Sequence, residues 1–396
     1  MNRDAPGRLV RRVLLMAPQP FFEWRGSPIR VGFTAQALAE LGYAVDLLVM
    51  PIGEPREIPG VRLFRAANPF GIRRLPIGPS IAKAALDTML AAKAVSLGGR
   101  QRYDVVHGIE DAGLIAALVG RRLRAAVVFE KHSDPASYRG GMLRNLVLGA
   151  YAHVEAAAVR SADAVIGTSP GLVAQATRIR PDVAAHHIFD IPSSLTEAVG
   201  EDVRTVRQLL TGGEDRILIT YVGSFAVYQG IDLMFESMPP ILDAAPAARF
   251  VVIGGSPGEV ATRRAWLEQR GLTDRVAFVG HVAPDRLPAY LRASDILLSP
   301  RLAGVNAPLK LLDYLKAGRA IVASDIEANR FVLDEESALL VEPTVPALVA
   351  GVRRLLDDAA LRERLGRQGR TKIDTLYNFT EFRRRLGICY QALFRT

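Results

Sequence analysis

The sequence predicts an α/β protein made of two doubly wound, Rossmann-like domains in tandem. Short apolar runs alternate with helical segments along the chain, and this rhythm occurs twice. The chain has 396 residues, enough for two or three domains, and 49% of them are hydrophobic. The apolar runs are continuous rather than alternating, which is typical of parallel strands buried on both faces. We therefore expect two parallel sheets, each covered by helices.

The first half contains six predicted strands. They are Arg12–Met16, Val45–Met50, Val61–Phe64, Val105–His107, Ala126–Phe129 and Ala164–Gly167. Helices are predicted between them, for example over Phe33–Leu41 and Gly113–Arg122, from the helical spacing of apolar residues. We assign residues 1–195 to this domain.

The second half repeats the pattern. Its predicted strands are Ile217–Val222, Arg249–Ile253, Val276–Val279, Ile296–Ser299, Ala320–Ala323 and Ala338–Val341, with helices over Asp232–Leu242 and Ala261–Gln269. The rhythm lapses over Ile191–Glu214, where proline, serine and glycine accumulate, so we place the second domain at 213–379. A final helix over 380–396 is expected to reach back to the first domain. Ligands of such folds bind beyond the carboxyl ends of the strands, which makes a cleft between the domains the expected active site.

Composition narrows the classes of function. A single cysteine, Cys389, excludes an internal disulfide framework and a Cys-rich zinc site. No apolar run is long enough to span a membrane or to form a signal-peptide core, so we expect a cytoplasmic protein. The chain lacks a P-loop, a dinucleotide-binding G-x-G-x-x-G after its first strand, a D-x-D motif and an H-E-x-x-H motif. We therefore expect neither a nicotinamide cofactor nor a metal.

Positive charge is concentrated in residues 56–102, which carry nine basic and two acidic side chains against a formal net charge of +9 for the whole chain. Apolar residues recur there at helical spacing over 81–97. A basic helix with an apolar face suits the anionic inner surface of a membrane, but a core helix with a solvated face has the same pattern. Nucleic acid is not an expected partner, because interleaved aromatics are few and no binding signature occurs.

Two glycine-containing loops follow predicted strands and present candidate ligand sites. In the first, Ser27 is a predicted N-cap and Pro28 the first helical residue, just after Gly26. Such a helix start offers free amides to an anion or a sugar hydroxyl. In the second, Gly223 ends a strand and Gly230 precedes a helix, which lets a ligand approach the backbone closely.

A third loop, Ser299–Leu309, leads into a helix for which Pro308 is the predicted first residue. Lys310 and Asp313 are three residues apart and share one face of this helix. A lysine in the first turn opposes the helix dipole, which indicates an anion nearby.

Together these motifs resemble the retaining, GT-B-fold glycosyltransferases of family 4. The strongest match combines Gly223, Gln229-Gly230, Pro308-x-Lys310-x-x-Asp313-Tyr314 and Ala317–Ser324. The same half also matches at Gly280-His281-Val282 and Leu291-x-x-Ser294-Asp295, and the first half matches more loosely, at Gly42–Val45, Asp104–His107 and Phe129–His132. The resemblance implies metal-independent hexosyl transfer, with retention, from a nucleotide-diphosphate sugar to a glycan or lipid-linked acceptor, as in polysaccharide biosynthesis. It places the acceptor on the N-terminal domain and the nucleotide sugar on the C-terminal one.

The resemblance also implies roles for individual residues. Asp313 matches the second acid of the family's E-x7-E motif, which binds the nucleotide ribose. His132 matches the histidine that touches the donor sugar, and Lys310 lies near the diphosphate; these two are the candidate catalytic residues. Gly26 and Ser27 face the acceptor or a phosphate. The other donor-binding candidates are Gly223, Ser224, Gln229, Gly280, His281, Val282, Arg301, Asn306, Ala307, Pro308 and Leu309.

Three positions depart from the family pattern. Val305 stands where the first acid of E-x7-E belongs, and Ser224 and Gln229 stand where the family usually has an arginine and a lysine. Two alternatives therefore stay open: a catalytically weakened relative that binds nucleotide or glycan, and a GT-B sugar-nucleotide epimerase, although epimerases use more cleft acids than this chain offers.

Overall fold

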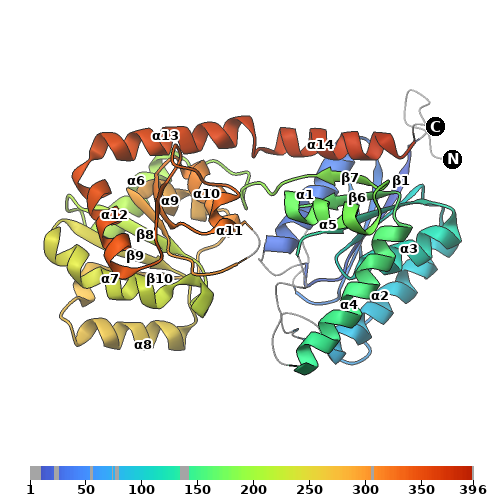
Figure 1. Cartoon of the computed structure of the whole chain (residues 1–396), viewed down its shortest axis with the longest axis horizontal. Helices are drawn as coiled ribbons and strands as arrows, with labels where there is room; N and C mark the ends of the chain where they lie inside the picture. Colours follow the sequence, from blue (N-terminus) through green and yellow to red (C-terminus); the bar gives the residue numbers. More distant parts are fainter. Residues whose placement is uncertain are drawn as a thin grey trace. The chain divides into compact units, whose positions relative to one another are not determined.

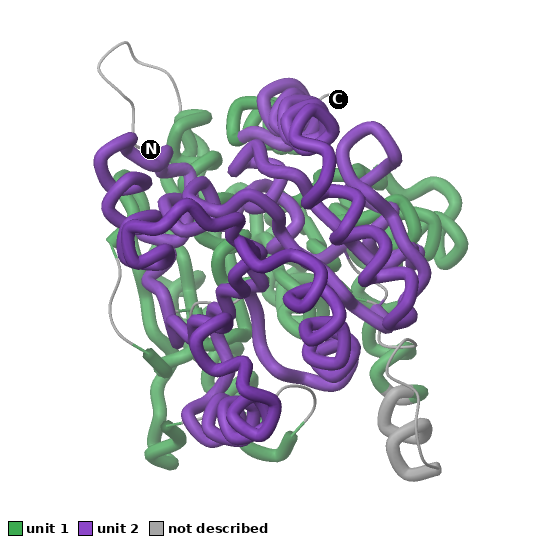
Figure 2. Tube along the Cα trace, turned by 90° about the vertical axis from the view of Figure 1, so that its left-hand side faces the viewer, with its two compact units in different colours: residues 1–190, 379–396 green, residues 191–378 purple. Residues whose placement is uncertain are grey.

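The computed structural model describes residues 10–21, 26–53, 57–73, 75, 80–133, 142–304 and 307–394, without the side chains of residues 142–148 and 150. The chain divides into two compact units, residues 1–190 with 379–396 and residues 191–378 (Figure 2). Each unit contains one parallel sheet with helices packed against it (Figure 1). The predicted fold class, two Rossmann-like α/β domains, is confirmed.

Unit 1 is built on a seven-stranded sheet in the order β3-β2-β1-β4-β5-β6-β7. Its strands are β1 Arg12–Ala17, β2 Ala44–Val49, β3 Val61–Arg65, β4 Val105–Ile109, β5 Ala126–Lys131, β6 Ala164–Gly167 and β7 Ala184–His187. Its helices are α1 Gly26–Glu40, α2 Ile81–Arg100, α3 Ala112–Leu123, α4 Met142–Ser161, α5 Pro170–Ile179 and α14 Phe379–Ala392. All six expected strands occur, and β7 extends the sheet at its edge.

Unit 2 contains a six-stranded sheet in the order β10-β9-β8-β11-β12-β13. Its strands are β8 Ile217–Val222, β9 Ala248–Ile253, β10 Val276–Gly280, β11 Ile296–Ser299, β12 Ala320–Ser324 and β13 Leu339–Val341. Its helices are α6 Gly200–Thr211, α7 Ile231–Ala244, α8 Pro257–Glu268, α9 Leu287–Ala293, α10 Leu309–Ala317, α11 Glu327–Arg330, α12 Val345–Asp357 and α13 Ala359–Thr375, with the 3₁₀ turns η2 Val227–Gln229 and η3 Thr273–Arg275.

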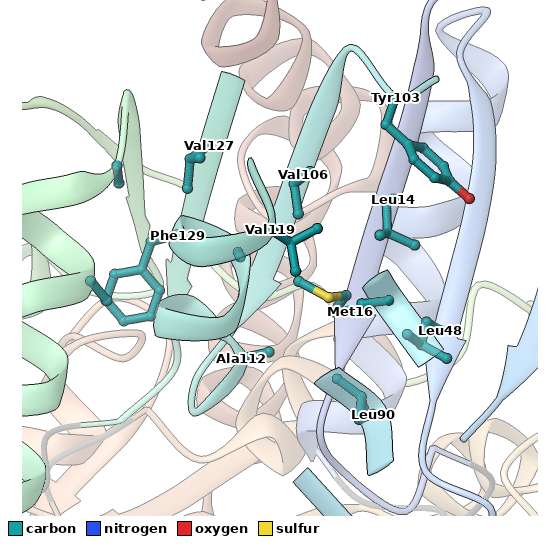
Figure 3. Close-up of a cluster of buried hydrophobic side chains, with 14 of the residues drawn as sticks. Leu14, Met16, Leu48, Leu90, Tyr103, Val106, Ala112, Val119, Val127 and Phe129 are labelled. Carbon is teal, nitrogen blue, oxygen red and sulfur yellow. The ribbon is translucent and has the colours of Figure 1, made fainter. Parts of the chain in front are cut away.

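The apolar runs of the strands form the cores, as their continuity predicts. In unit 1, Leu14 and Met16 of β1 and Leu48 of β2 belong to one buried cluster with Leu90 of α2 and Val119 of α3 (Figure 3). Each is at most 4% exposed. Burial of a side chain of this size contributes about 1.5–3 kcal/mol, so these layers hold the strand ends, and the loops that follow them, in place.

The unit boundaries differ from the expected ones. Unit 2 begins at Ile191 rather than at residue 213. The intervening helix α6 packs against α9 and buries Val206 and Leu210, so it is part of unit 2 and not a linker. Helix α14 belongs to unit 1, where it packs on α1 with the rings of Phe33 and Phe379 6.1 Å apart. Among the described helices, none combines the length and the apolar character that a membrane span requires.

Candidate functional site

Lys310 is the central cation of the candidate site in unit 2. It lies in the first turn of α10, and its Nζ donates a hydrogen bond of 2.9 Å to Oε1 of Gln229 in η2. The same Nζ lies 4.5 Å from the centre of the Tyr221 ring. Burial, with a smaller contribution from the charge of Arg301, lowers the pKa of the Lys310 amine to about 7.

Glycines keep the backbone open beside this amine. Gly223 follows β8 with φ +150°, and a Cβ there would lie 2.8 Å from Oη of Tyr221 and 3.5 Å from Nζ of Lys310. Gly254 connects this turn to β10, because its amide donates to the carbonyl of Gly280 and a Cβ on it would overlap the Gly223 carbonyl. Gly223, Gln229, Gly280 and Lys310 are thus gathered at the carboxyl ends of β8 and β10.

Gly230 allows the loop after β8 to lie against the backbone that follows β11. It caps η2 with φ +71°, and a Cβ there would lie 1.8 Å from the carbonyl oxygen of Pro300, which follows β11. The loop from Arg301 returns to η2, where the amide of Leu302 donates to the Tyr228 carbonyl. Only glycine permits this contact between the two loops.

Asp313 lies one turn beyond Lys310 but contacts a different segment. Its Oδ1 accepts a hydrogen bond of 2.7 Å from the amide of Ser193. Burial raises the pKa of Asp313 to about 6, although the hydrogen bond from Ser193 opposes that shift. One turn further on, Nζ of Lys316 donates to the carbonyls of Ser194 and Thr196. Helix α10 therefore carries the Lys310 amine in its first turn, and its later turns bind the segment at the start of unit 2 through Asp313 and Lys316.

The remaining donor-binding candidates surround these groups. Ser224 contributes its carbonyl to the hydroxyl of Tyr221, at 2.8 Å, and His281 is exposed just after β10. Pro308 is the N-cap of α10 and not its first residue as expected, because its ψ of 121° is extended; the helix therefore starts one position later, at Leu309. Val305 and Asn306 lie outside the described residues. The others are Val282, Ala307 and Leu309, all partly buried.

The second cluster, in unit 1, brings together Ser27 and His132. The hydroxyl of Ser27 lies 2.5 Å from Nδ1 of His132, which follows β5. Helix α1 begins at Gly26, so Ser27 lies within its first turn instead of capping it as predicted. The other ring nitrogen of His132, Nε2, lies 2.8 Å from Oε1 of Glu130.

Glu130 is a buried carboxylate in close contact with Arg30, His107 and His132. Nε of Arg30 lies 2.5 Å from its Oε1, and Nε2 of His107 lies 3.0 Å from its Oε2. Arg30 also donates to Asp190 and to the carbonyls of residues 188 and 189. Burial alone would raise the pKa of Glu130, but Arg30, His107 and His132 outweigh it and hold that pKa well below its usual value.

Glu110 braces the loop that carries His132. It follows β4 with φ +50°, an unusual conformation for a residue with a side chain. Its carboxylate accepts hydrogen bonds from the His132 amide, at 2.5 Å, and from the Ser133 hydroxyl, at 3.0 Å. Burial raises the pKa of Glu110.

Several supporting residues were missed by sequence reasoning. Arg30 and Glu130 are 100 residues apart and pair only through the fold, so no local signal identifies them. Tyr314 belongs to a family motif, but the motif does not reveal its contacts. Its hydroxyl accepts from the Val222 amide and donates to the Leu298 carbonyl, joining β8 to β11 beside Lys310.

Two other chemistries do not fit the described residues. The run Gly254–Gly258 has the G-x-S-x-G spacing of a hydrolase nucleophile, but Ser256 forms a capping box with Glu259 at the start of α8. In the described part of the chain, no group of three or more His, Cys, Asp or Glu side chains is arranged to hold a metal ion.

Two Rossmann-like units with glycines at their strand ends have the architecture of the GT-B fold. Two family models match successive parts of the chain: "Glycosyl transferase 4-like domain" over residues 25–192 and "Glycosyl transferases group 1" over residues 216–358. The chain belongs to this family, the family 4 glycosyltransferases, as its motifs indicated.

Several known proteins match nearly the whole chain in sequence or in structure. A subunit of the phosphatidylinositol N-acetylglucosaminyltransferase of Arabidopsis thaliana is 22% identical over 96% of this chain and 81% of its own length. Sucrose-phosphate synthase from Thermosynechococcus elongatus has a TM-score of 0.77 at 23% identity, covering 97% of this chain and 99% of the other. Anabaena HepE in complex with UDP-glucose has a TM-score of 0.71 at 14% identity, covering 96% and 99%. Three further curated relatives, 26% to 30% identical, match over only 36% to 40% of their own length.

Proposed function

We propose that this protein transfers a hexose from a nucleotide-diphosphate sugar to a glycan or lipid-linked acceptor, with retention of the anomeric configuration. The observation that carries the proposal is the partly buried Lys310 amine facing the glycine backbone at Gly223. A diphosphate is the group that a partly buried ammonium beside open backbone suits best, because it supplies both the charge and the hydrogen-bond acceptors that the amine needs.

Charge stabilisation would come from fixed groups of unit 2. Lys310 and the amides at the start of α10 would hold the leaving diphosphate, where an ammonium in a site of low polarity acts strongly on developing negative charge. The transfer that we propose uses no metal ion. Asp313 would bind the ribose through its carboxylate, and His132 with Ser27 would contact the donor sugar. The leaving phosphate would take the proton of the acceptor hydroxyl.

A nucleotide-dependent melting shift tests the donor site. UDP, GDP, ADP and CMP are added separately, and the nucleotide that stabilises the protein is then tested as its sugar conjugate. A ligand at a hundred times its Kd adds about 2.7 kcal/mol of stability. We expect one nucleoside diphosphate to raise Tm and its sugar conjugate to be slowly hydrolysed. No shift with any of them at millimolar concentration would contradict the proposal.

One observation favours a second candidate, a relative that binds nucleotide or glycan without turnover. Gln229 supplies a neutral amide where the family usually has a cation, and its carbonyl engages the Lys310 amine directly. The donor site then has one less charge for the leaving diphosphate. A nucleotide sugar that binds, raises Tm and is never consumed would favour this candidate.

We also propose that the basic segment 56–102 attaches the protein to anionic membrane surfaces. On α2, Ile81 is 93% exposed and Val95 45% exposed, which offers apolar contact area. Arg62 and Lys83 contribute less, because Arg62 pairs with Asp46 and Lys83 pairs with acidic side chains of unit 1. Cosedimentation with phosphatidylglycerol vesicles, compared with phosphatidylcholine vesicles, tests the attachment; equal recovery from both would contradict it.

A further inference from the structure

Five polar side chains of unit 1 lie in a row of close contacts that ends in the C-terminal helix. Oγ of Ser27 contacts Nδ1 of His132, at 2.5 Å, and Nε2 of His132 lies 2.8 Å from Oε1 of Glu130. On the other side of the same carboxylate, Oε2 lies 3.0 Å from Nε2 of His107, an ion-pair contact whose orientation falls outside hydrogen-bond geometry. Nδ1 of His107 lies 2.8 Å from the hydroxyl of Tyr390, in α14.

The chemistry of these groups fixes where the protons lie. An ionised carboxylate only accepts hydrogen bonds, and Glu130 faces the Nε2 atom of both imidazoles. In a neutral imidazole, a proton on Nε2 leaves Nδ1 as an acceptor. The hydroxyls of Ser27 and Tyr390 are then the donors to the two Nδ1 atoms.

The side chains in this row of contacts are deeply buried. The side chains of His107, Glu130 and Tyr390 are at most 1% exposed, and that of His132 is 9% exposed. Water is therefore excluded from most of this row of groups, and the charge of Glu130 acts on both imidazoles at close range. Arg30 also donates to Oε1 of Glu130 and favours the ionised form of this carboxylate.

We propose that Glu130, His107 and Tyr390 are positioning residues for His132, which keep its proton on Nε2 and turn Nδ1 toward the Ser27 hydroxyl. The inference rests on the proposed function, in which His132 and Ser27 contact substrate. Ser27 then has a defined role, because its proton is held by His132 and its oxygen lone pairs are presented to a substrate hydroxyl. The C-terminal helix also takes part in the active site through Tyr390.

The same connectivity, serine to histidine to carboxylate, occurs in hydrolases, but the surroundings here do not suit a nucleophile. The residue after Ser27 is Pro28, which has no amide to contribute to an oxyanion hole. Glu130 is also shared with Arg30 and His107, so it does not serve His132 alone. Orientation of a hydrogen-bonding hydroxyl is the role that fits.

Histidine tautomers measured by NMR test the inference without reference to activity. The full chain is labelled with ¹⁵N-histidine; it contains six histidines, and His107→Gln and His132→Gln identify the two signals. We expect both imidazoles to carry the proton on Nε2. A proton on Nδ1 of His132 in the unmodified protein would overturn the proposal.

Glu130→Gln tests directly whether the Glu130 carboxylate sets the tautomers of the two histidines. The amide of glutamine accepts on one side and donates on the other, and Oε1 already receives both Arg30 and His132. We therefore expect the amide nitrogen to face His107 and to move its proton to Nδ1, while His132 keeps its proton on Nε2. Unchanged tautomers at both histidines would contradict the relay.

If the Glu130 variant does not fold, Tyr390→Phe provides a second test of the proposal. Its matched control is Tyr43→Phe, because the Tyr43 ring packs 5.2 Å from that of Tyr390 and its hydroxyl is outside the network. We expect Tyr390→Phe to change the His107 signal and to lower kcat about tenfold with KM for the donor unchanged, while Tyr43→Phe changes neither. A Tyr390 variant with normal kcat and a lowered Tm would show a structural role only. If the unmodified protein consumes no nucleotide sugar, the proposed function fails while the tautomers still decide the relay.

Discussion

Lys310 should make nucleotide binding depend on pH. Burial lowers the pKa of its amine from 10.5 to about 7 in the unliganded protein. A diphosphate placed beside the amine stabilises its charged form, so above pH 7 the binding reaction takes up a proton. Affinity for the nucleotide must then fall as the pH rises, whereas below pH 7 the amine is already charged and adds no dependence.

The size of the effect follows from the pKa values. While the pH lies above the pKa of Lys310 in the free protein and below its pKa in the complex, Kd rises toward tenfold per pH unit. With a free pKa of about 7 and a bound pKa near the ordinary value, Kd should increase roughly 15-fold between pH 7.0 and 8.5.

Isothermal titration of the stabilising nucleoside diphosphate at four pH values measures this slope. Lys310→Arg is the matched control, because a guanidinium stays charged throughout the range and the nucleotide's own titration is common to both proteins. We expect the slope in the unmodified protein and almost none in the variant. Equal slopes would refute the placement of Lys310 beside the phosphates.

Three further predictions concern stability and reactivity. Gly230→Ala should lower the free energy of unfolding by about 3 kcal/mol, because positive φ strain is joined by overlap with a backbone carbonyl; Gly213→Ala, with φ +84° and open space, should lose only about 1 kcal/mol in the same urea titration. Arg30→Met should destabilise by about 3–5 kcal/mol, since it removes the main charge partner of buried Glu130, and a loss below 1 kcal/mol would argue against that pair. Cys389 is buried, which raises the pKa of its thiol to about 12, so it should react with a disulfide reagent only after unfolding; rapid labelling of the folded protein would contradict its burial.

Most of the fold is readable from the sequence because buried parallel strands have a simple signature. Runs such as Val105–His107 and Ile296–Ser299 are short, continuous and apolar, and each one is a strand. The exception is β7, whose sequence Ala-Ala-His-His is not an apolar run and lies at the sheet edge, where one side lacks a neighbour. The predicted start of α1 is too late because Gly26 and Ser27 suggest a turn.

The site was less predictable, because its decisive contacts join distant parts of the chain. Spacing within one helix correctly brought Lys310 and Asp313 onto α10, but it did not show that they contact different segments. The partnership of His107 with Tyr390 spans 283 residues and depends on α14 packing on unit 1. Such pairs have no local pattern; they exist only once the sheet and its helices are assembled.

Release of nucleoside diphosphate from a nucleotide sugar is the decisive assay for the proposed transfer. The unmodified protein, Lys310→Ala and His132→Ala are each incubated with the donor identified by the melting shift, and nucleotide release is followed with time. We expect turnover by the unmodified protein and a loss of at least about a hundredfold in both variants. A protein that binds the donor but never releases nucleotide, or one whose turnover survives loss of His132, would contradict the proposal.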